Sequence, residues 1–402
     1  MFDGGSVVAA VTVRAVNGMT ARWVRDIKGE RGTVLTAAGV WPLLALLAGP
    51  AGGAAREELQ GALGIGADGA VAAGRELLES LRAQPGIDAA VGVWSRRDLP
   101  LRPLWRMALP VGAHEVFSGE REGDQRALDA WAARNTDGLI ERMPVVVDDD
   151  TRMLLASALL VRTTWREPFD ETFLEAAAGP WAGQTAAGLV RYQDLGEELA
   201  VLHTPDGPVT SLRVDGDNGI DVRLVLGPEG CAPGAVLAAG VADVEGVAER
   251  TPGQALPDGP YAPGVTVRTV PSWSTTPRLA TCVPSFTVSA EHDLLERAEL
   301  FGLKTAQDER TGHFPGISDE PLAVSQARQS ATATFGPLGF RAAAVTAIPA
   351  TAGAAPMEPP YQAKIHQVVF DRPFGFLAVH RASGLVLAAG WVAEPEVRVG
   401  MW

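Results

Sequence analysis

The positions of apolar and polar residues predict three helices in the first part of the chain. Residues 16–30 place large apolar side chains at helical spacing, which predicts an amphipathic helix. Residues 36–47 are almost all apolar, as expected of a helix that is buried on every side. Residues 56–63 predict a short third helix that ends at Gly64.

Farther along the chain, short strands alternate with turn signals. Alternation over residues 89–94 predicts a strand, and residues 123–141 predict a helix. From residue 190 to about 289, short strands are separated by turn sequences such as PDGP, DGDNG and GPEG, with one helical piece over 236–250. This pattern predicts an α+β fold. No linker divides the chain, so we expect a single domain over residues 1–402.

Residues 322–356 are the stretch around which we expect the rest of the chain to be organised. A strand ends at Gly336, and Gly339 then permits an unusual backbone turn. A tract of small, uncharged side chains follows over 342–347. Prolines in the tail prevent pairing as an interior strand, so residues 337–363 are predicted to form an exposed, mostly extended loop. A small-residue tract behind a glycine is able to slide into a gap in a sheet.

The charge of the chain narrows the classes of partner. A formal net charge of −14 and a pI near 5.0 argue against binding to nucleic acid or to an anionic membrane surface. The most apolar stretch, residues 40–48, is too short to cross a bilayer. The first residues lack the positive charge of a signal peptide, so we expect a cytoplasmic protein.

Candidate motifs for catalysis or for metal and cofactor binding fail on their context. GIGADG at residues 64–69 matches the dinucleotide fingerprint, but it follows a helix, and we expect no helix N-terminus there to receive a phosphate. The carboxylates of residues 148–150 do not converge on a metal, and Cys231 and Cys282 lack metal-ligand spacing. The six histidines are scattered. We therefore expect no metal and no cofactor, and assign no catalytic residue.

The ten tryptophans are many for a chain of this length. Trp41, Trp131 and Trp165 fall on predicted core elements and are interpreted as packing residues. Trp273 lies among turn residues, where it could face a ligand, but core packing is its expected role.

Five segments, in order along the chain, are similar to parts of the serpins. They correspond to the family's buried helix with the short helix after it (33–64), the helix over the main sheet (128–140), the strand that ends in the central tryptophan (151–170), the HFPGIS motif (313–318) and the last two buried strands (370–395). The resemblance implies a serpin fold with three β-sheets, about eight or nine helices and an exposed reactive-centre loop. We expect a bacterial member of the family with a divergent hinge and shutter.

In inhibitory serpins a protease cleaves this loop, and the small-residue segment then inserts into the main sheet as a new strand. Aligned without gaps from Leu322, Gly339 stands at the family's hinge glycine, which favours inhibition. The small residues of the inserting segment are Ala342, Ala343, Ala344 and Thr346.

Four residues at the hinge depart from the family pattern. Pro337 and Leu338 stand where the family usually has glutamates, and Arg341 replaces another glutamate. Phe340 replaces the small residue that enters the sheet first, and overpacking of this kind typically costs about 1–3 kcal/mol. Pro337 also removes a backbone donor from the strand that leads to the hinge.

The gate below the main sheet departs from the pattern too. In the family, two serines, an asparagine and a histidine hydrogen-bond there and control the separation of strands. The matching positions hold Thr36, Gly39, Ser157 and Gln329. Three of these side chains are able to form a smaller network, whereas Gly39 contributes none. With Trp165 they make up the predicted shutter and breach residues.

Changes at both hinge and gate lead us to expect weakened or lost loop insertion, and hence a non-inhibitory binding or scaffold protein. The alternative is a suicide-substrate inhibitor of an elastase- or subtilisin-like serine protease, cleaved near Gly353–Ala354 or at Met357, because no Lys or Arg lies between Arg341 and Lys364. A second alternative is a serpin scaffold recruited to process a small molecule. The expected partner is a serine protease with small-residue specificity or a small-molecule ligand, and the expected state is a monomer.

Overall fold

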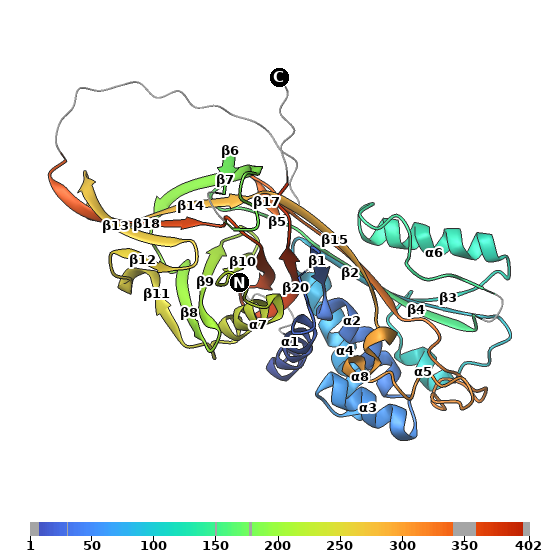
Figure 1. Cartoon of the computed structure of the whole chain (residues 1–402). Coiled ribbons are helices and arrows are strands. Elements are labelled where there is room, and N and C mark those ends of the chain that lie inside the picture. Colours follow the sequence, from blue (N-terminus) through green and yellow to red (C-terminus); the bar gives the residue numbers. More distant parts are fainter. Residues whose placement is uncertain (1–7, 30, 149–150, 177–178, 341–358, 397–402) are drawn as a thin grey trace, which may run out of the picture.

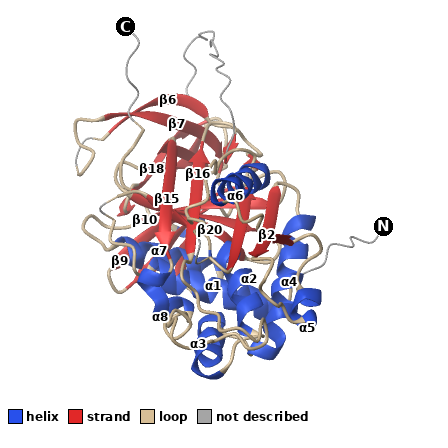
Figure 2. Cartoon of the chain, turned by 90° about the vertical axis from the view of Figure 1, so that its right-hand side faces the viewer, coloured by secondary structure: helices blue, strands red, loops and turns tan. Residues whose placement is uncertain are grey.

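The computed structural model describes residues 8–29, 31–148, 151–176, 179–340 and 359–396. Within these ranges eight α-helices gather mostly at one end of the molecule and the strands at the other, with α6 set apart on the sheet (Figures 1 and 2). The helix count agrees with the predicted eight or nine. The helices are α1 (Ala10–Val24), α2 (Ala37–Ala48), α3 (Gly53–Leu63), α4 (Ala67–Ala83), α5 (Pro103–Ala108), α6 (Arg121–Asn135), α7 (Pro233–Val244) and α8 (Ala298–Phe301). Two 3₁₀ turns cover Gly253–Ala255 and Leu295–Arg297.

The largest sheet has seven strands and packs against α1 and α7 (Figure 1). Its order is β1 (Thr33–Leu35), β20 (Leu385–Val392), β19 (Phe374–His380), β10 (Ile220–Leu226), β9 (Gly207–Val214), β8 (Leu199–Thr204) and β11 (Arg250–Pro252). All of its pairings are antiparallel. A second sheet has six strands in the order β12 (Gly259–Ala262), β13 (Val265–Ser272), β18 (Tyr361–Val369), β14 (Arg278–Pro284), β7 (Thr185–Asp194) and β6 (Asp170–Glu175).

The central sheet consists of two hydrogen-bonded parts. One part has the order β3 (His114–Val116), β2 (Ile87–Ser95) and β4 (Met153–Val161). The other has the order β15 (Phe286–Asp293), β16 (Arg328–Phe335), β17 (Gly339–Phe340) and β5 (Thr163–Thr164). Only Arg162 separates β4 from β5, so the two parts form one sheet. Four groups of paired strands therefore make up the three sheets that the serpin resemblance predicts.

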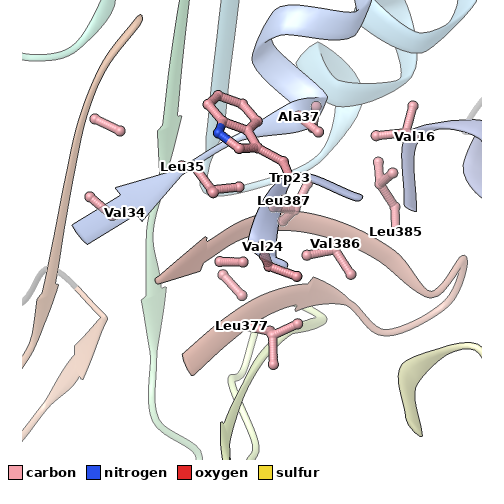
Figure 3. Close-up of a cluster of buried hydrophobic side chains, with 14 of the residues drawn as sticks. Val16, Trp23, Val24, Val34, Leu35, Ala37, Leu377, Leu385, Val386 and Leu387 are labelled. Atoms are coloured by element: carbon pink, nitrogen blue, oxygen red, sulfur yellow. The ribbon is translucent and has the colours of Figure 1, made fainter. Parts of the chain in front are cut away.

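The core is continuous from the helical end into the seven-stranded sheet. Figure 3 shows Trp23 of α1 close to Leu35 of β1 and Leu387 of β20, and each of these side chains is at most 1% exposed. Burying one such leucine contributes about 1.5–3 kcal/mol relative to leaving it in water. The predicted all-apolar helix is α2, in which eleven of twelve residues are buried, and the Thr36 side chain caps it by accepting a hydrogen bond from the Gly39 N–H.

The structure corrects several boundaries that the sequence predicts. Helix α6 ends at Asn135 instead of residue 141, because the chain turns through left-handed conformations at Asp137 and Gly138. Helix α7 covers 233–244 instead of 236–250, and Gly246, also left-handed, follows its end.

The structure also corrects the prediction that no helix begins at residues 64–69. Helix α4 begins at Ala67, so a helix N-terminus does follow the glycines, contrary to our expectation. The element that precedes them is helix α3, as predicted, whereas the dinucleotide fingerprint requires a strand. The prediction for Trp273 was also wrong, because this side chain is 60% exposed: it lies just beyond the end of β13, outside the paired strands.

The described residues contain neither a metal-binding cluster nor a helix that could span a membrane. Among them, no set of His, Cys, Asp and Glu side chains is arranged to hold a metal ion, and both cysteines are free thiols. None of the helices in the described ranges has the length and apolar character required to cross a bilayer.

Candidate functional site: the opening of the central sheet

The two parts of the central sheet leave facing strand edges unpaired. Strand β4 pairs with β2 on one side, and no strand in the described ranges pairs with its other edge. Strand β16 pairs with β15 along its whole length, but on its other side its pairing within the described part of the chain is limited to Phe335. An unpaired edge presents backbone donors and acceptors that accept an added strand. Among the residues that the structure describes, the sheet is therefore open between β4 and β16.

At one end of this opening, residues 335–340 form a tight hairpin, which we call the hinge hairpin. Phe335 of β16 pairs with Phe340 of β17, and the Gly336 N–H donates to the Gly339 carbonyl at 3.0 Å. Strand β17 also pairs with β5 on its other side, so it lies between β16 and β5. The first two residues of a strand between the two parts of the sheet are thus already in place.

The turn of the hinge hairpin is held by backbone contacts near Trp165. The Trp165 N–H donates to the Leu338 carbonyl at 2.9 Å, and the Phe169 N–H donates to the Pro337 carbonyl at 2.9 Å. The indole Nε1 of Trp165 donates to the Gly336 carbonyl at 2.9 Å. Pro337 thus lies in the turn, where no ladder donor is needed, and not in the strand that leads to it as the sequence suggested.

Gly339 and Phe340 are fitted to their positions in β17. A Cβ on Gly339 would lie 2.2 Å from the Thr163 carbonyl oxygen, so only glycine fits there. Phe340 is 3% exposed, and its ring centroid lies 6.2 Å from that of Phe376 in β19. The side chain that we expected to resist entry into the sheet is therefore already packed inside it.

An aromatic cluster supports the hinge hairpin from below. The ring of Phe335 lies 4.8 Å from that of Trp165 and is stacked 5.4 Å from that of Phe286. The guanidinium of Arg191 lies 4.4 Å over the ring of Phe169, and burial lowers the pKa of Arg191. Cation–π contact of this kind offsets part of the cost of burying the charge.

Near the other end of β16, a second set of contacts ties the sheet to the start of α2. The Thr36 N–H donates to Oε1 of Gln329 at 3.0 Å, and Nε2 of Gln329 donates to the Thr36 carbonyl at 2.9 Å. The Thr36 hydroxyl donates to the Leu387 carbonyl of β20 at 2.6 Å. A Cβ on Gly39 would lie 3.7 Å from Cβ of Leu159 in β4, so this end of α2 also faces the other edge of the opening.

His292 belongs to the same set, and our sequence analysis missed it. It is the cross-strand partner of Gln329, and its Nε2 lies 2.9 Å from the Val34 carbonyl of β1. Its ring contacts Trp23 edge-on at 5.2 Å. The strand alternation of residues 286–293 gives no signal that distinguishes this histidine, because its role depends on pairing with β16. We call the contacts of Thr36, Gln329 and His292 the shutter contacts.

The remaining predicted site residues fall into two groups. Ser157 is half-buried on β4 and makes no hydrogen bond with Thr36 or Gln329, so among described residues the predicted three-residue network reduces to Thr36 and Gln329. The other predicted loop residues lie outside the described ranges: Arg341, Ala342, Ala343, Ala344, Thr346, Gly353, Ala354 and Met357.

Comparison with known proteins establishes the family. The model of the family Serpin (serine protease inhibitor) matches residues 16–177 and 264–395. The chain belongs to the serpin family. It is 24% identical to serpin-Z6C of Oryza sativa subsp. japonica, over 95% of this chain and 97% of that protein, and 26% identical to plasminogen activator inhibitor 1 of Bos taurus, over 91% and 87%.

A solved structure shows the same fold. Human thyroxine-binding globulin complexed with thyroxine matches with a TM-score of 0.72 and 16% identity, covering 97% of this chain and 100% of that one. The predicted serpin fold is confirmed. One relative is named as an inhibitor and one structural neighbour is named for binding thyroxine, so membership of the family alone does not select a mode of action.

Replacing Gln329 by alanine should loosen the shutter contacts. The variant removes two hydrogen bonds to the Thr36 backbone and leaves buried polar groups unpaired, so we expect the free energy of unfolding to fall by about 1–3 kcal/mol. Urea unfolding measures this loss. Gln326→Ala is a matched control, because Gln326 makes the same pair of backbone bonds to Val146 at an exposed position. An equal loss in both variants would contradict a special role for Gln329.

His292 should make the fold sensitive to acid. Burial lowers the pKa of His292 from its ordinary value of 6.5. The hydrogen bond with the Val34 carbonyl opposes this change, and the positive charge of Arg297 adds to the lowering. The unfolded chain therefore binds a proton more readily than the folded chain, so stability from this group is complete above about pH 6.5 and is lost as the pH falls toward the lowered pKa. Thermal unfolding between pH 7.5 and 5 should show a smaller acid loss in His292→Gln than in the parent. His203→Gln, at an exposed position in β8, should keep the full loss.

Proposed function

We propose that this serpin is a suicide-substrate inhibitor of a serine protease, acting by insertion of residues after Phe340 into the central sheet. The observation that carries the proposal is the position of β17 between β16 and β5, with Phe340 buried. Below it, the edges of β4 and β16 are free along the direction in which an extended strand would continue. A new strand there would gain ladder hydrogen bonds on both sides, at about 0.5–1.5 kcal/mol net for each bond.

The side chains that would follow Phe340 suit this path. Side chains alternate between the two faces of a strand, so Ala342, Ala344 and Thr346 would share the inward face with Phe340. All three are small. Arg341 would point outward, where its charge remains in solvent. Because of this alternation, the charge of Arg341 would not have to be buried when the strand inserts.

The same geometry weakens the argument for a non-inhibitory protein. We expected weakened insertion because Phe340 would have to be forced between strands and because Pro337 would interrupt a strand. Phe340 already occupies its site in the uncleaved chain, and Pro337 lies in the turn of the hinge hairpin. Of these arguments against inhibition, the reduced set of shutter contacts remains. Fewer shutter contacts make the strands easier to separate, although they also reduce control over when the strands separate.

The target that fits the loop is a protease with a small or apolar specificity pocket. Residues 342–363 contain no Lys or Arg, which disfavours trypsin-like enzymes. Cleavage near Gly353–Ala354, or at Met357, suits an elastase- or subtilisin-like enzyme. One relative, plasminogen activator inhibitor 1, carries the name of an inhibitor, which supports the mode of action but not a target.

A pair of loop variants tests insertion directly. Ala344→Arg would place a charge on the inward face of the inserting strand, and Ala343→Arg would place the same charge on the outward face. With subtilisin or elastase as the protease, we expect the parent and Ala343→Arg to form a covalent complex that survives denaturing electrophoresis. Ala344→Arg should be cleaved with at least a tenfold loss of complex, because a buried unpaired charge slows insertion below hydrolysis.

Two other outcomes of this experiment would each contradict part of the proposal. Cleavage without complex in all three proteins, the parent included, would contradict the proposal and favour the non-inhibitory alternative. Equal complex formation by both arginine variants would show that trapping does not require the inward face of this segment.

A further inference from the structure

A cavity of about 170 Å³ lies away from the opening of the central sheet, between the chain that follows α1, the start of α7 and the ends of β10 and β20. Its walls are mainly apolar: Pro180, Pro228, Pro233, Val236, Pro373 and the indole of Trp391. An apolar protein cavity of about 150 Å³ is large enough to hold benzene. The cavity therefore has room for a compound with a single ring.

Trp391 supplies an unused hydrogen-bond donor at this cavity. The side chain is 5% exposed, and its Nε1 is buried without a hydrogen-bond partner. Other buried indoles of the chain are satisfied: Nε1 of Trp41 donates to the Leu63 carbonyl, that of Trp105 to the Leu46 carbonyl and that of Trp181 to the Ala393 carbonyl, at 3.2, 3.2 and 2.9 Å. A buried indole N–H usually finds a partner, so the one at Trp391 needs an explanation.

The free donor has no accessible surface and lies next to Gly29, another wall residue of the cavity. A Cβ on Gly29 would lie 3.3 Å from Nε1 of Trp391 and 2.3 Å from Cγ of Pro233. Gly29, which covers Nε1, has a φ of 83°, a value that residues other than glycine rarely adopt. No side chain therefore lies between its backbone and Nε1. An added atom there would meet Pro233, so a ligand atom contacts Nε1 only when Gly29 and Pro233 move apart.

The charges at the rim favour a neutral ligand. Arg372 lines the cavity, but its Nε donates to Oδ1 of Asp371 at 2.8 Å, and this contact raises the pKa of Arg372. Glu229 lines the cavity and is a second carboxylate near Arg372, whose pKa its charge also raises. One positive charge against two negative ones disfavours a carboxylate or phosphate ligand.

We propose that this cavity binds a small, neutral ring compound with one acceptor oxygen, such as an aryl ketone, which accepts a hydrogen bond from Nε1 of Trp391. The proline walls contact the ring, and the oxygen satisfies the one donor that the fold leaves unpaired at this place. The site is separate from the hinge hairpin, so it does not depend on protease inhibition.

Two probes of similar shape test the site. Acetophenone carries the acceptor oxygen, and ethylbenzene lacks it. With the full chain labelled with ¹⁵N at its tryptophan indoles, we expect acetophenone to shift the Nε1–H resonance of Trp391, which is identified by its loss in Trp391→Phe. The corresponding resonance of Trp105, whose N–H is already bonded inside the core, should not move. Ethylbenzene should shift the Trp391 resonance much less.

Affinities then separate the hydrogen bond from the cavity. Trp391→Phe should bind acetophenone about five- to tenfold more weakly than the parent, the value of one net hydrogen bond, with ethylbenzene affinity within twofold. Trp105→Phe should change neither. A Trp391 resonance unmoved by saturating acetophenone, or moved equally by ethylbenzene, would overturn the proposal. The resonance test uses the parent chain, so it stands even if Trp391→Phe folds poorly.

Discussion

The central interaction of the structure is the pairing of β17, which consists of Gly339 and Phe340, with β16 on one side and β5 on the other. It joins the two parts of the central sheet at one end and leaves the edges of β4 and β16 unpaired beyond it. The close approach of Gly339 to the Thr163 carbonyl permits no other residue, and the burial of Phe340 fixes which face of a continuing strand would turn inward. The hinge hairpin thus sets the register of any segment that enters the sheet.

The shutter contacts oppose that entry from the other end of β16. Gln329 holds the backbone of Thr36 with both atoms of its amide, and His292 on the neighbouring strand contacts β1. Separating the strands further requires these contacts to shift, because α2 packs against β4 while Gln329 belongs to β16. The protein therefore has a short strand that pairs with both β16 and β5 at one end of the opening, and a hydrogen-bonded restraint at the other. Widening the existing opening between β4 and β16 therefore requires this restraint to be released.

The fold was largely predictable from the sequence, whereas the arrangement of the hinge hairpin and of the shutter contacts was not. The apolar run of α2 and the strand before Gly336 follow from periodicity, and the order of motifs identified the serpin fold. The position of Phe340 depends instead on how the Gly336–Gly339 turn folds back beside β5, which pattern and propensity do not encode. His292 was missed for the same reason, since its contact with β1 arises from cross-strand pairing with Gln329. Helix α4 was missed because its beginning overlaps a glycine-rich motif at which we expected no helix N-terminus.

The most direct test of insertion is the thermal unfolding of intact chain and of chain nicked between residues 347 and 358. Subtilisin or elastase should make the cut, and excess protease is then inactivated before the scan. If the freed segment enters the opening between β4 and β16, the melting temperature should rise by tens of degrees, because a strand paired on both sides adds many hydrogen bonds and buried contacts. An unchanged melting temperature would mean that the segment stays outside the sheet, and would contradict the proposed mechanism.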